Sequence, residues 1–223
     1  MERLLEDRRE FLKRAVAAAS ALPLLAACGG ETAAQKADSI LDTIKRNAMP
    51  DPNLGRQGGW VGAVHAPADV SWRTVLSEEK DRGEPIEISG VVYQSDGKTI
   101  APNTLIYLYH TDFEGIYGRA GDAHGHGKYR GWMLTDKDGK YSFRTIKPAP
   151  YPVNRFAAHI HMTVTTAKAR EDWVDSILFE GDRLISPQER AQAGRRGGFN
   201  PILSFEKGSD GILRATRNIQ LIA

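Results

Sequence analysis

The chain has 223 residues, 41% of them hydrophobic and 26% charged, which is an ordinary composition for a soluble globular protein. Its formal net charge is only +2, so it has no electrostatic footprint for nucleic acid, and we expect no nucleic-acid partner. A single cysteine excludes an internal disulfide, so packing, together with any bound metal, must hold the core.

The N-terminus has the pattern of an export signal. A charged stretch, DRREFLKR, precedes an apolar run over residues 15–27 that is too short to span a bilayer. RREFLK resembles a twin-arginine signal, and LAAC resembles a bacterial lipobox with Cys28 as the lipidated residue. We therefore predict a signal peptide over 1–27 and an exported lipoprotein, periplasmic or at the cell surface, anchored to a membrane at Cys28. The alternative is an amphipathic helix over 2–27 with an incidental thiol.

The next two segments carry little periodic pattern. Residues 28–58 are small and polar except for one amphipathic patch, ADSILDTIKRN, so we predict a tether with a short helix there. Residues 59–82 are irregular, and TVLSEEKDRG indicates a short helix or turn. We place the start of the folded domain, residues 59–223, at this point.

From Glu84 onward, strands alternate with tight turns. PIEISGVVYQ, NTLIYLYHTD and AAHIHMTVTTA predict strands, and RGWMLTDKDGKYSFRTI predicts a hairpin that turns at Asp138-Gly139. SPQERAQAG predicts a short helix that begins after Ser186 and ends at Gly194. Strands that recur at short intervals with tight turns favour an all-β fold, an antiparallel β-sandwich with short peripheral helices.

Two histidines and two tyrosines have the spacing of a metal site. His159 and His161 are two residues apart in AHIHM, so on a strand both imidazoles point to the same face. Tyr151 lies upstream in PAPYP, where prolines stiffen the backbone, and Tyr117 lies in EGIYGR. Two phenolates and two imidazoles form a hard, anionic set of ligands, which suits a trivalent metal such as Fe(III).

Three consecutive segments of the chain resemble the intradiol ring-cleavage dioxygenases, the group of protocatechuate 3,4-dioxygenase and catechol 1,2-dioxygenase. They are GVVYQSDGKTIAPNTLIYLYHTDFEGIY, RGWMLTDKDGKYSFRTIKPAPYP and AHIHM. The resemblance runs from Glu84 to Met162, with a weaker echo in ILFEGD at 177–182. The block TD-x-DG-x-Y-x-F-x-TI-x-P-x-PYP followed by A-H-I-H is highly specific.

The resemblance implies a β-sandwich with one mononuclear non-haem Fe(III), held by Tyr117, Tyr151, His159 and His161. In this family the tyrosine of the PYP motif leaves the metal when a catechol chelates it, so Tyr151 would be the mobile ligand and a general base. The implied reaction uses O₂ to open a catechol ring between its two hydroxyl-bearing carbons, giving a muconate-type diacid. The particular catechol and the oligomeric state stay open.

The chain departs from the family pattern beside the histidines. An arginine is usual three residues before the first histidine, but Phe156 stands there and Arg155 is one step earlier. A shift of one residue on a strand turns a side chain to the opposite face, so Arg155 reaches the site only if a bulge realigns it. A glutamine is also common where this chain has Ser176. Arg130 is an alternative source of positive charge.

Two rival functions follow from weaker patterns. A non-catalytic β-sandwich that binds a ligand at the cell surface would fit the missing arginine and glutamine. A hydrolase or oxygenase could instead hold Zn or Fe(II) through His159, His161 and a carboxylate. The candidates for that carboxylate are Asp112, Asp122 and Glu180. A second H-x-H, formed by His124 and His126, lies in a glycine-rich loop, and we expect polar residues near the mouth of the site there.

Overall fold

The computed structural model describes residues 33–48, 62–118, 125–153 and 156–222. The predicted signal peptide over 1–27 and Cys28 lie outside these residues. The contacts of the chain divide it at Ala34, and nearly all of the described residues belong to the second unit, Gln35–Ala223. Within the described part of the chain, no helix is long and apolar enough to cross a membrane.

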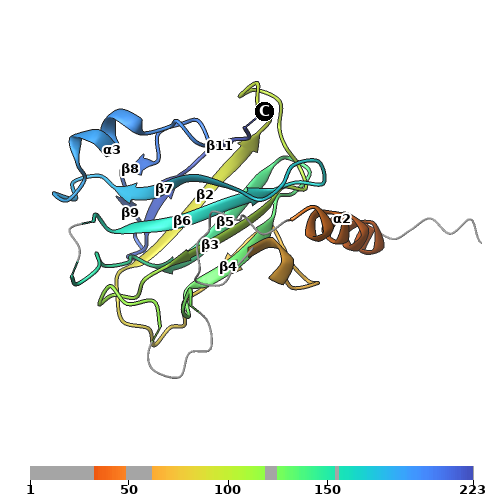
Figure 1. The fold of residues 1–223 in the computed structure, drawn as a ribbon. Coiled ribbons are helices and arrows are strands. Elements are labelled where there is room, and N and C mark those ends of the chain that lie inside the picture. Colours follow the sequence, from red (N-terminus) through yellow and green to blue (C-terminus); the bar gives the residue numbers. More distant parts are fainter. Residues whose placement is uncertain (1–32, 49–61, 119–124, 154–155, 223) are drawn as a thin grey trace, which may run out of the picture. The chain divides into compact units, whose positions relative to one another are not determined.

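Two β-sheets make up most of the fold (Figure 1). The first sheet has the order β1-β5-β2-β10-β9, with β11 also paired to β2. The second has the order β4-β3-β6-β7-β8. The strands of the first sheet are β1 (Arg73–Val75), β2 (Pro85–Tyr93), β5 (Lys140–Ile146), β9 (Glu206–Lys207), β10 (Leu213–Thr216) and β11 (Ile219–Gln220). Those of the second are β3 (Leu105–His110), β4 (Arg130–Leu134), β6 (His159–Thr165), β7 (Asp172–Phe179) and β8 (Ile202–Leu203).

The predicted all-β sandwich is confirmed, but the hairpin predicted over residues 130–146 is wrong. Its turn at Asp138-Gly139 forms, but β4 belongs to the second sheet and β5 to the first, so the turn connects the two sheets. The long central strands pair antiparallel: β2 with β5, β3 with both β4 and β6, and β6 with β7. Shorter strands join in parallel: β1 to β5, β10 and β11 to β2, and β8 to β7. Both sheets are therefore mixed. The parallel partners come from segments distant in sequence, which local hairpin signals do not predict.

Side-chain alternation separates the main core from the outer face of the second sheet. Ile160, Met162 and Val164 of β6 pack between the two sheets, together with Ile88 of β2 and Phe143 of β5. Because successive side chains on a strand point to opposite faces, the odd-numbered residues of β6 face outward. His159 and His161 therefore lie on the outer face, away from the main core.

A helix and a 3-10 turn cover one end of that outer face. Helix α2 (Ala33–Asn47) buries Leu41 and Ile44 against Leu105 of β3 and Leu134 of β4. The 3-10 helix η1 (Gly62–His65) follows, and its Gly62 carbonyl accepts a hydrogen bond from Trp132 Nε1 at 2.7 Å. The predicted short helix is thus packed on the sheet over at least part of its length. The helices do not cover the opposite end of the face, where the loops that carry Tyr117 and Tyr151 lie beside His159.

Helix α3 (Pro187–Gln192) is short, and it begins as the sequence predicts. Ser186 is the N-cap and accepts a hydrogen bond from the Glu189 amide at 3.1 Å, while Glu189 Oε2 accepts from the Ser186 amide at 2.7 Å. This reciprocal pair is a capping box, and it satisfies two amides that a helix start leaves without partners. It also places the Glu189 side chain beside β7.

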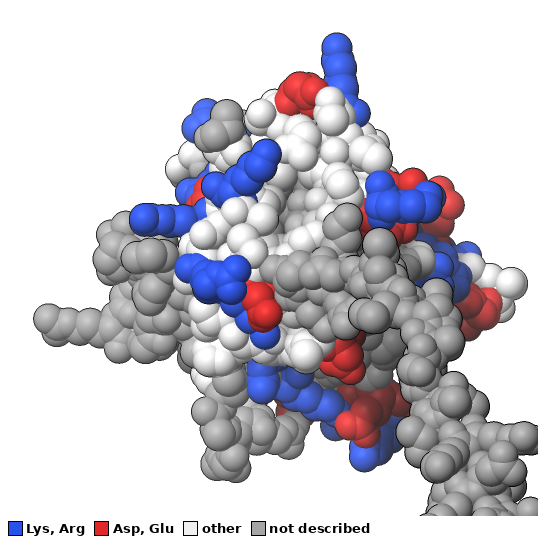
Figure 2. All heavy atoms as spheres, turned by 90° about the vertical axis from the view of Figure 1, so that its right-hand side faces the viewer, with Lys and Arg blue, Asp and Glu red and all other residues white. Residues whose placement is uncertain are grey.

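Charges of both signs are mixed on the face of the molecule shown in Figure 2. Several ion pairs of the described residues are exposed, such as Arg190 with Glu180 at 2.9 Å and Arg214 with Asp210 at 2.6 Å. Exposed pairs of this kind contribute only about 0–1 kcal/mol each to stability. We therefore attribute the stability of the fold mainly to the two packed faces of the second sheet.

Candidate active site

Four possible metal-donor atoms meet at the open end of the outer face. Tyr117 Oη lies 2.6 Å from Tyr151 Oη, and Tyr151 Oη lies 3.2 Å from His159 Nε2. His159 Nε2 lies 3.0 Å from His161 Nε2. The structure therefore brings together the four side chains that the sequence singles out. We call this group the donor quartet.

Strand β6 and its neighbours orient the two imidazoles. His159 Nδ1 donates to the Ala157 carbonyl at 2.7 Å, which leaves Nε2 with its lone pair directed at the quartet. Just before His159, the Ala158 amide donates to Asp182 Oδ2 at 2.9 Å and fixes the start of the strand. His161 Nδ1 lies 3.3 Å from Ser176 Oγ. Partners on the remote ring nitrogen are typical of metal-binding histidines.

Loop contacts bring the two tyrosines together. After β3, Asp112 Oδ1 accepts from the Glu114 and Ile116 amides, which folds the loop that leads to Tyr117. The same loop is bound to the PAPYP segment, because the Ala149 amide donates to the Asp112 carbonyl at 3.0 Å. Gly115, at φ +81°, lies so close to the Pro150 carbonyl that a Cβ would overlap it. This close contact holds the Tyr117 loop against the Tyr151 loop.

Gly127 supports Tyr117 from the other side. Its φ is +67°, and a Cβ built there would overlap the carbonyl oxygen of Tyr117. A positive φ is strained for a residue with a side chain, and the close approach leaves no room for one. The backbone of Tyr117 is therefore in direct contact with the Cα of Gly127.

An aromatic layer lies behind the quartet. Tyr109 of β3 stacks on His161 with ring centroids 4.7 Å apart, and on His126 at 3.7 Å with the planes nearly parallel. His126 Nδ1 also lies 2.8 Å from Tyr107 Oη. As expected, this loop histidine is a polar residue beside the site, and its partners are aromatic side chains. His124 lies outside the described residues, so the second H-x-H is described only in part.

Burial controls protonation in the quartet. Burial, followed by the charge of nearby His159, lowers the pKa of His161 to about 3, so this imidazole is neutral at pH 7. Burial, and then the hydrogen bond with Tyr151, raise the pKa of Tyr117 far above that of a free phenol. A neutral imidazole presents a lone pair, and a buried phenol loses its proton only when a nearby cation stabilises the phenolate.

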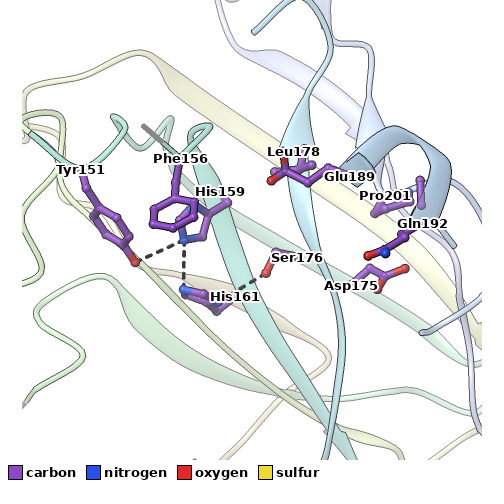
Figure 3. A pocket seen from close by; sticks show the side chains of 11 residues that line it. Tyr151, Phe156, His159, His161, Asp175, Ser176, Leu178, Glu189, Gln192 and Pro201 are labelled. Carbon is purple, nitrogen blue, oxygen red and sulfur yellow. Dashed lines mark hydrogen bonds between the residues drawn. The ribbon is translucent and has the colours of Figure 1, made fainter. Parts of the chain in front are cut away.

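A cavity of about 380 Å³ opens beside the quartet (Figure 3). Tyr151 and Phe156 lie at one end, and β7 and α3 form the other. Tyr117 does not line this cavity; it borders a separate hollow together with Arg82 and Lys128. The lining residues are Tyr151, Phe156, His159, His161, Asp175, Ser176, Leu178, Glu189, Gln192, Ala193 and Pro201.

A β-bulge brings two consecutive residues of β7 to the same cavity. Ile160 pairs with Ile177, but Met162 pairs with Val174, so Asp175 and Ser176 together face His161 alone. A bulge interrupts the alternation of side chains and redirects one of them, as it often does near active sites. The sequence analysis considered Ser176 but missed Asp175, because strict alternation would place adjacent residues on opposite faces.

Helix α3 supplies the other residues that the sequence analysis missed. Glu189 and Gln192 line the cavity, although they follow His161 by about thirty residues in sequence. The capping box predicts where α3 begins, but a local pattern does not predict what the helix faces. This part of the chain is held beside the site by long-range contacts with β7, namely the parallel pairing of β8 and the hydrogen bonds of the Gly194 and Arg196 amides to Asp175.

Arg130 is not part of the quartet. It lies opposite Tyr109 on β4, and Tyr109 lies opposite His161, so the guanidinium starts two strands away. Two strand spacings correspond to about 10 Å. Its Nη1 donates to the Gly127 carbonyl, while its buried Nε has no partner among the described residues. Arg155, the other predicted positive charge, lies outside the described residues.

The carboxylates considered for a rival metal site are engaged elsewhere. Asp112 binds backbone amides of its own loop, and Glu180 pairs with Arg190 at the surface. Asp122 lies outside the described residues. Among the residues that the structure describes, no three His, Cys, Asp or Glu side chains come together in a way that would hold a metal. The metal-donor set that the described residues do form includes the two tyrosines.

Comparison with known proteins agrees with this geometry. A family described as "Dioxygenase" matches residues 63–200, more than half of the chain. Hydroxyquinol 1,2-dioxygenase of Nocardioides simplex is 33% identical over 119 residues, which are 46% of this chain and 40% of that protein. Chlorocatechol 1,2-dioxygenase of Pseudomonas sp. (strain P51) is 31% identical over 173 residues, 64% of this chain and 68% of that protein.

Solved structures share the fold. The 3-chlorocatechol 1,2-dioxygenase of Rhodococcus opacus 1CP superposes with a TM-score of 0.55 at 18% identity, over 70% of this chain and 66% of that one. A dioxygenase domain from Streptomyces sp. SirexAA-E superposes with a TM-score of 0.52 at 22% identity, over 69% of this chain and 89% of that one.

The chain belongs to the intradiol ring-cleavage dioxygenase family. It spans about half the length of several relatives that it matches in sequence, such as catechol 1,2-dioxygenase 1 of Acinetobacter lwoffii, of which it covers 51%.

Proposed function

We propose that this protein is an Fe(III)-dependent intradiol dioxygenase. It would use O₂ to cleave a catechol between its two hydroxyl-bearing carbons, giving a cis,cis-muconate-type diacid. The observation that carries the proposal is the donor quartet, in which each donor atom lies within 3.2 Å of the next. Both oxygen atoms of O₂ enter the product, so the reaction needs no external reductant.

The residues of the quartet fit a trivalent metal ion. His159 and His161 both direct Nε2 toward the two phenols, and a phenol becomes an anionic donor when a nearby cation stabilises the phenolate. Tyr117, Tyr151, His159 and His161 would hold the ion. When bound, a ferric ion would act as a Lewis acid on a coordinated diol. A single phenolate and a doubly deprotonated catechol together match its three positive charges.

The cavity supports different roles for the two tyrosines. Tyr151 lines the cavity beside His159 and His161, whereas Tyr117 lies behind Tyr151 and does not line it. A catechol that enters from the cavity meets Tyr151 first, so Tyr151 is the ligand that it would displace. The freed phenolate would then accept a proton from the substrate hydroxyl, as a general base does. Tyr117, supported by Gly127, would stay in place.

The proposal is tested with purified residues 29–223 loaded with iron. A ferric ion bound to tyrosinate absorbs visible light, so the protein should be coloured. A panel of catechols should cause O₂ uptake, with a ring-opened diacid as the product. A colourless protein after iron loading would favour a non-catalytic binding module. A coloured protein that consumes no O₂ with any catechol would reject the dioxygenase activity but not the ferric site.

We also propose that the chain is exported by a twin-arginine signal over 1–27 and anchored through a lipid on Cys28. The order of the RREFLK and LAAC patterns supports this, because the twin-arginine route carries folded proteins that already hold their metal. Mass spectrometry of the membrane fraction tests it. A lipidated N-terminal Cys28 peptide is the expected result, and an uncleaved, unmodified peptide would overturn the proposal.

A further inference from the structure

The cavity beside the quartet is larger than a bare catechol ring requires. Its volume is about 380 Å³. A dry apolar cavity of about 150 Å³ is enough to hold benzene. The remaining space extends from His161 toward β7 and α3, where Leu178, Ala193 and Pro201 form apolar walls. A substrate that fills it carries a substituent on the ring.

The far end of this cavity is acidic. Asp175 projects from the bulge in β7, and Glu189 and Gln192 project from α3 (Figure 3). Among the described residues that line the cavity, none is a lysine or an arginine. A carboxylate on the ring would therefore meet two negative charges.

Each carboxylate keeps one oxygen available to a ligand. Asp175 uses Oδ2 to accept from the Gly194 amide at 2.9 Å and the Arg196 amide at 3.1 Å. Glu189 uses Oε2 to accept from the amide and from the hydroxyl of Ser186, at 2.7 Å each. Asp175 Oδ1 and Glu189 Oε1 have no partner within the described residues. Both groups are thus held in place by one oxygen and can accept a donor with the other.

Among the residues that the structure describes, the arginines near this end of the cavity do not neutralise it. Arg190 pairs with Glu180, and the Arg196 side chain bonds Asp172 and the Trp173 carbonyl. Arg217 is attracted to Asp175, but it is fully buried, does not line the cavity, and directs Nη1 at three backbone carbonyls. It offsets part of the charge of Asp175 and leaves Glu189 uncompensated.

We infer that the substrate is a ring-substituted catechol whose substituent is positively charged or is a neutral hydrogen-bond donor, held by Asp175 and Glu189, and that carboxylate-bearing catechols are disfavoured. The inference rests on the proposed function, because it places the diol at the donor quartet. It deepens that function by assigning the far end of the cavity as the specificity site. An ammonium or hydroxyl group there would satisfy the two free carboxylate oxygens.

Three catechols of nearly equal size test the inference. They are 4-(2-aminoethyl)catechol, 4-(2-hydroxyethyl)catechol and (3,4-dihydroxyphenyl)acetic acid. We expect kcat/KM to follow the order amine, alcohol, acid, with at least a tenfold difference between amine and acid. Dissociation constants measured by calorimetry without O₂ should follow the same order. An acid that is bound and turned over as well as the amine would overturn the inference.

Charge variants locate the effect. The double variant Asp175→Asn with Glu189→Gln keeps hydrogen-bond acceptors for the amides, and glutamine also serves in a capping box. It should bring the amine and acid to within about threefold of each other. The control is Glu206→Gln, which removes a negative charge from an exposed position on β9 outside the cavity and should leave the ratio unchanged. If the double variant does not fold, Gln192→Lys on exposed α3 should shift the preference toward the acid.

The outcomes separate this inference from the proposed function. If none of the three catechols consumes O₂ but binding still follows the charge order, the dioxygenase proposal fails and the specificity site stands. If all three are cleaved and bound equally, or if the double variant leaves the ratio unchanged, the specificity site is rejected and the dioxygenase proposal stands. If none of them binds, this inference is rejected.

Discussion

The histidines and the tyrosines of the donor quartet are held by different kinds of structure. His159 and His161 lie on β6, which is paired on both sides, and their orientation follows from the alternation of a strand. Tyr117 lies on the loop after β3, and Tyr151 lies on the loop after β5. The positions of these two loops depend on close contacts between their backbones. We refer to these as the strand half and the loop half of the site.

This difference suggests which part of the site can move. A strand in the middle of a sheet shifts only if its ladder of hydrogen bonds breaks. A loop can reposition a side chain by changing a few dihedral angles. The proposed displaceable ligand, Tyr151, belongs to the loop half, as a ligand exchanged in each turnover should. Variants in the two halves should therefore differ in what they do to metal binding, stability and turnover.

Removing a ligand from the strand half should abolish the site. His161→Ala takes away one imidazole, and no neighbour on the rigid strand can replace it. Because losing only an outer partner of a metal ligand costs about 10–100-fold, we expect a loss of more than about 10³-fold in kcat/KM. Iron content and visible absorbance should fall with it. His65→Gln, at an exposed histidine on η1, is the control. Normal iron content in His161→Ala would refute the quartet as the metal site.

The sheet that carries the strand half should lose stability in acid, through His110 on the neighbouring strand β3. His110 is fully buried; Nδ1 donates to the Thr111 carbonyl and Nε2 accepts from Thr145 Oγ1, both at 2.7 Å. Burial lowers its pKa from 6.5 to about 4. Between these two values the unfolded chain binds more protons than the folded one, so stability present above pH 6.5 is lost as the pH falls toward 4.

The loss assigned to His110 is about 3 kcal/mol when complete. Urea denaturation of the iron-free protein at a series of pH values measures it. His161, whose pKa is also lowered by burial, acts in the same direction. His110→Gln keeps a donor and an acceptor but does not titrate, so its stability should depend less steeply on pH over this range. An unchanged pH dependence in the variant would exclude His110 as the source.

Within the loop half, the two tyrosines should behave differently when a catechol binds. Tyr151→Phe removes the displaceable ligand and base, and we expect a loss of about 10²-fold in kcat. Its remaining tyrosinate absorbance, from Tyr117, should persist when a catechol is added without O₂. In Tyr117→Phe, the tyrosinate absorbance from Tyr151 should disappear on catechol binding. Stopped-flow spectra distinguish the two, and the opposite pattern would exchange the roles of the tyrosines.

A substitution at Gly127 should disturb the backbone contact that positions Tyr117 in the loop half. Gly127→Ala adds a side chain at φ +67°, where it overlaps the Tyr117 carbonyl. The control is Gly211→Ala, at φ +80° with no atom within 4 Å, which has the strain of positive φ alone. Positive φ costs roughly 1–2 kcal/mol. We expect Gly127→Ala to lose about 1 kcal/mol more than the control in urea denaturation, and to lose tyrosinate absorbance as Tyr117 shifts. Equal losses would show that Tyr117 does not depend on this contact.

The smallest effect is expected at the bulge that joins the strand half to the cavity. Ser176→Ala removes the hydroxyl 3.3 Å from His161 Nδ1. A hydrogen bond of this length contributes at most about 1 kcal/mol, so we expect a three- to fivefold loss in kcat/KM. Ser176→Thr, which keeps a hydroxyl, should restore most of it. A loss in both variants would point to packing in place of the hydrogen bond.

Local patterns in the sequence were sufficient for the strand half. Alternation in AHIHM placed His159 and His161 on one face. The predicted turn at Asp138-Gly139 is also present, whereas the predicted hairpin is wrong, because β4 and β5 on either side of that turn belong to different sheets. The start of α3 followed from Ser186 and Pro187. Each of these features arises from residues within a few positions of one another, and the preferences of the backbone there are the same in any fold.

The tertiary structure decided the rest, because it depends on contacts between distant segments. It brought the Tyr117 loop against the PAPYP loop, where the sequence supplied only two candidate residues. It placed Arg130 two strands from His161, and it added Asp175 through a bulge that alternation does not predict. Glu189 and Gln192 reached the cavity because the segment after α3 binds β7, through the pairing of β8 and through hydrogen bonds to Asp175. Local sequence patterns thus predict the kind of chemistry, whereas the shape and charge of the cavity depend on how segments distant in sequence pair with one another.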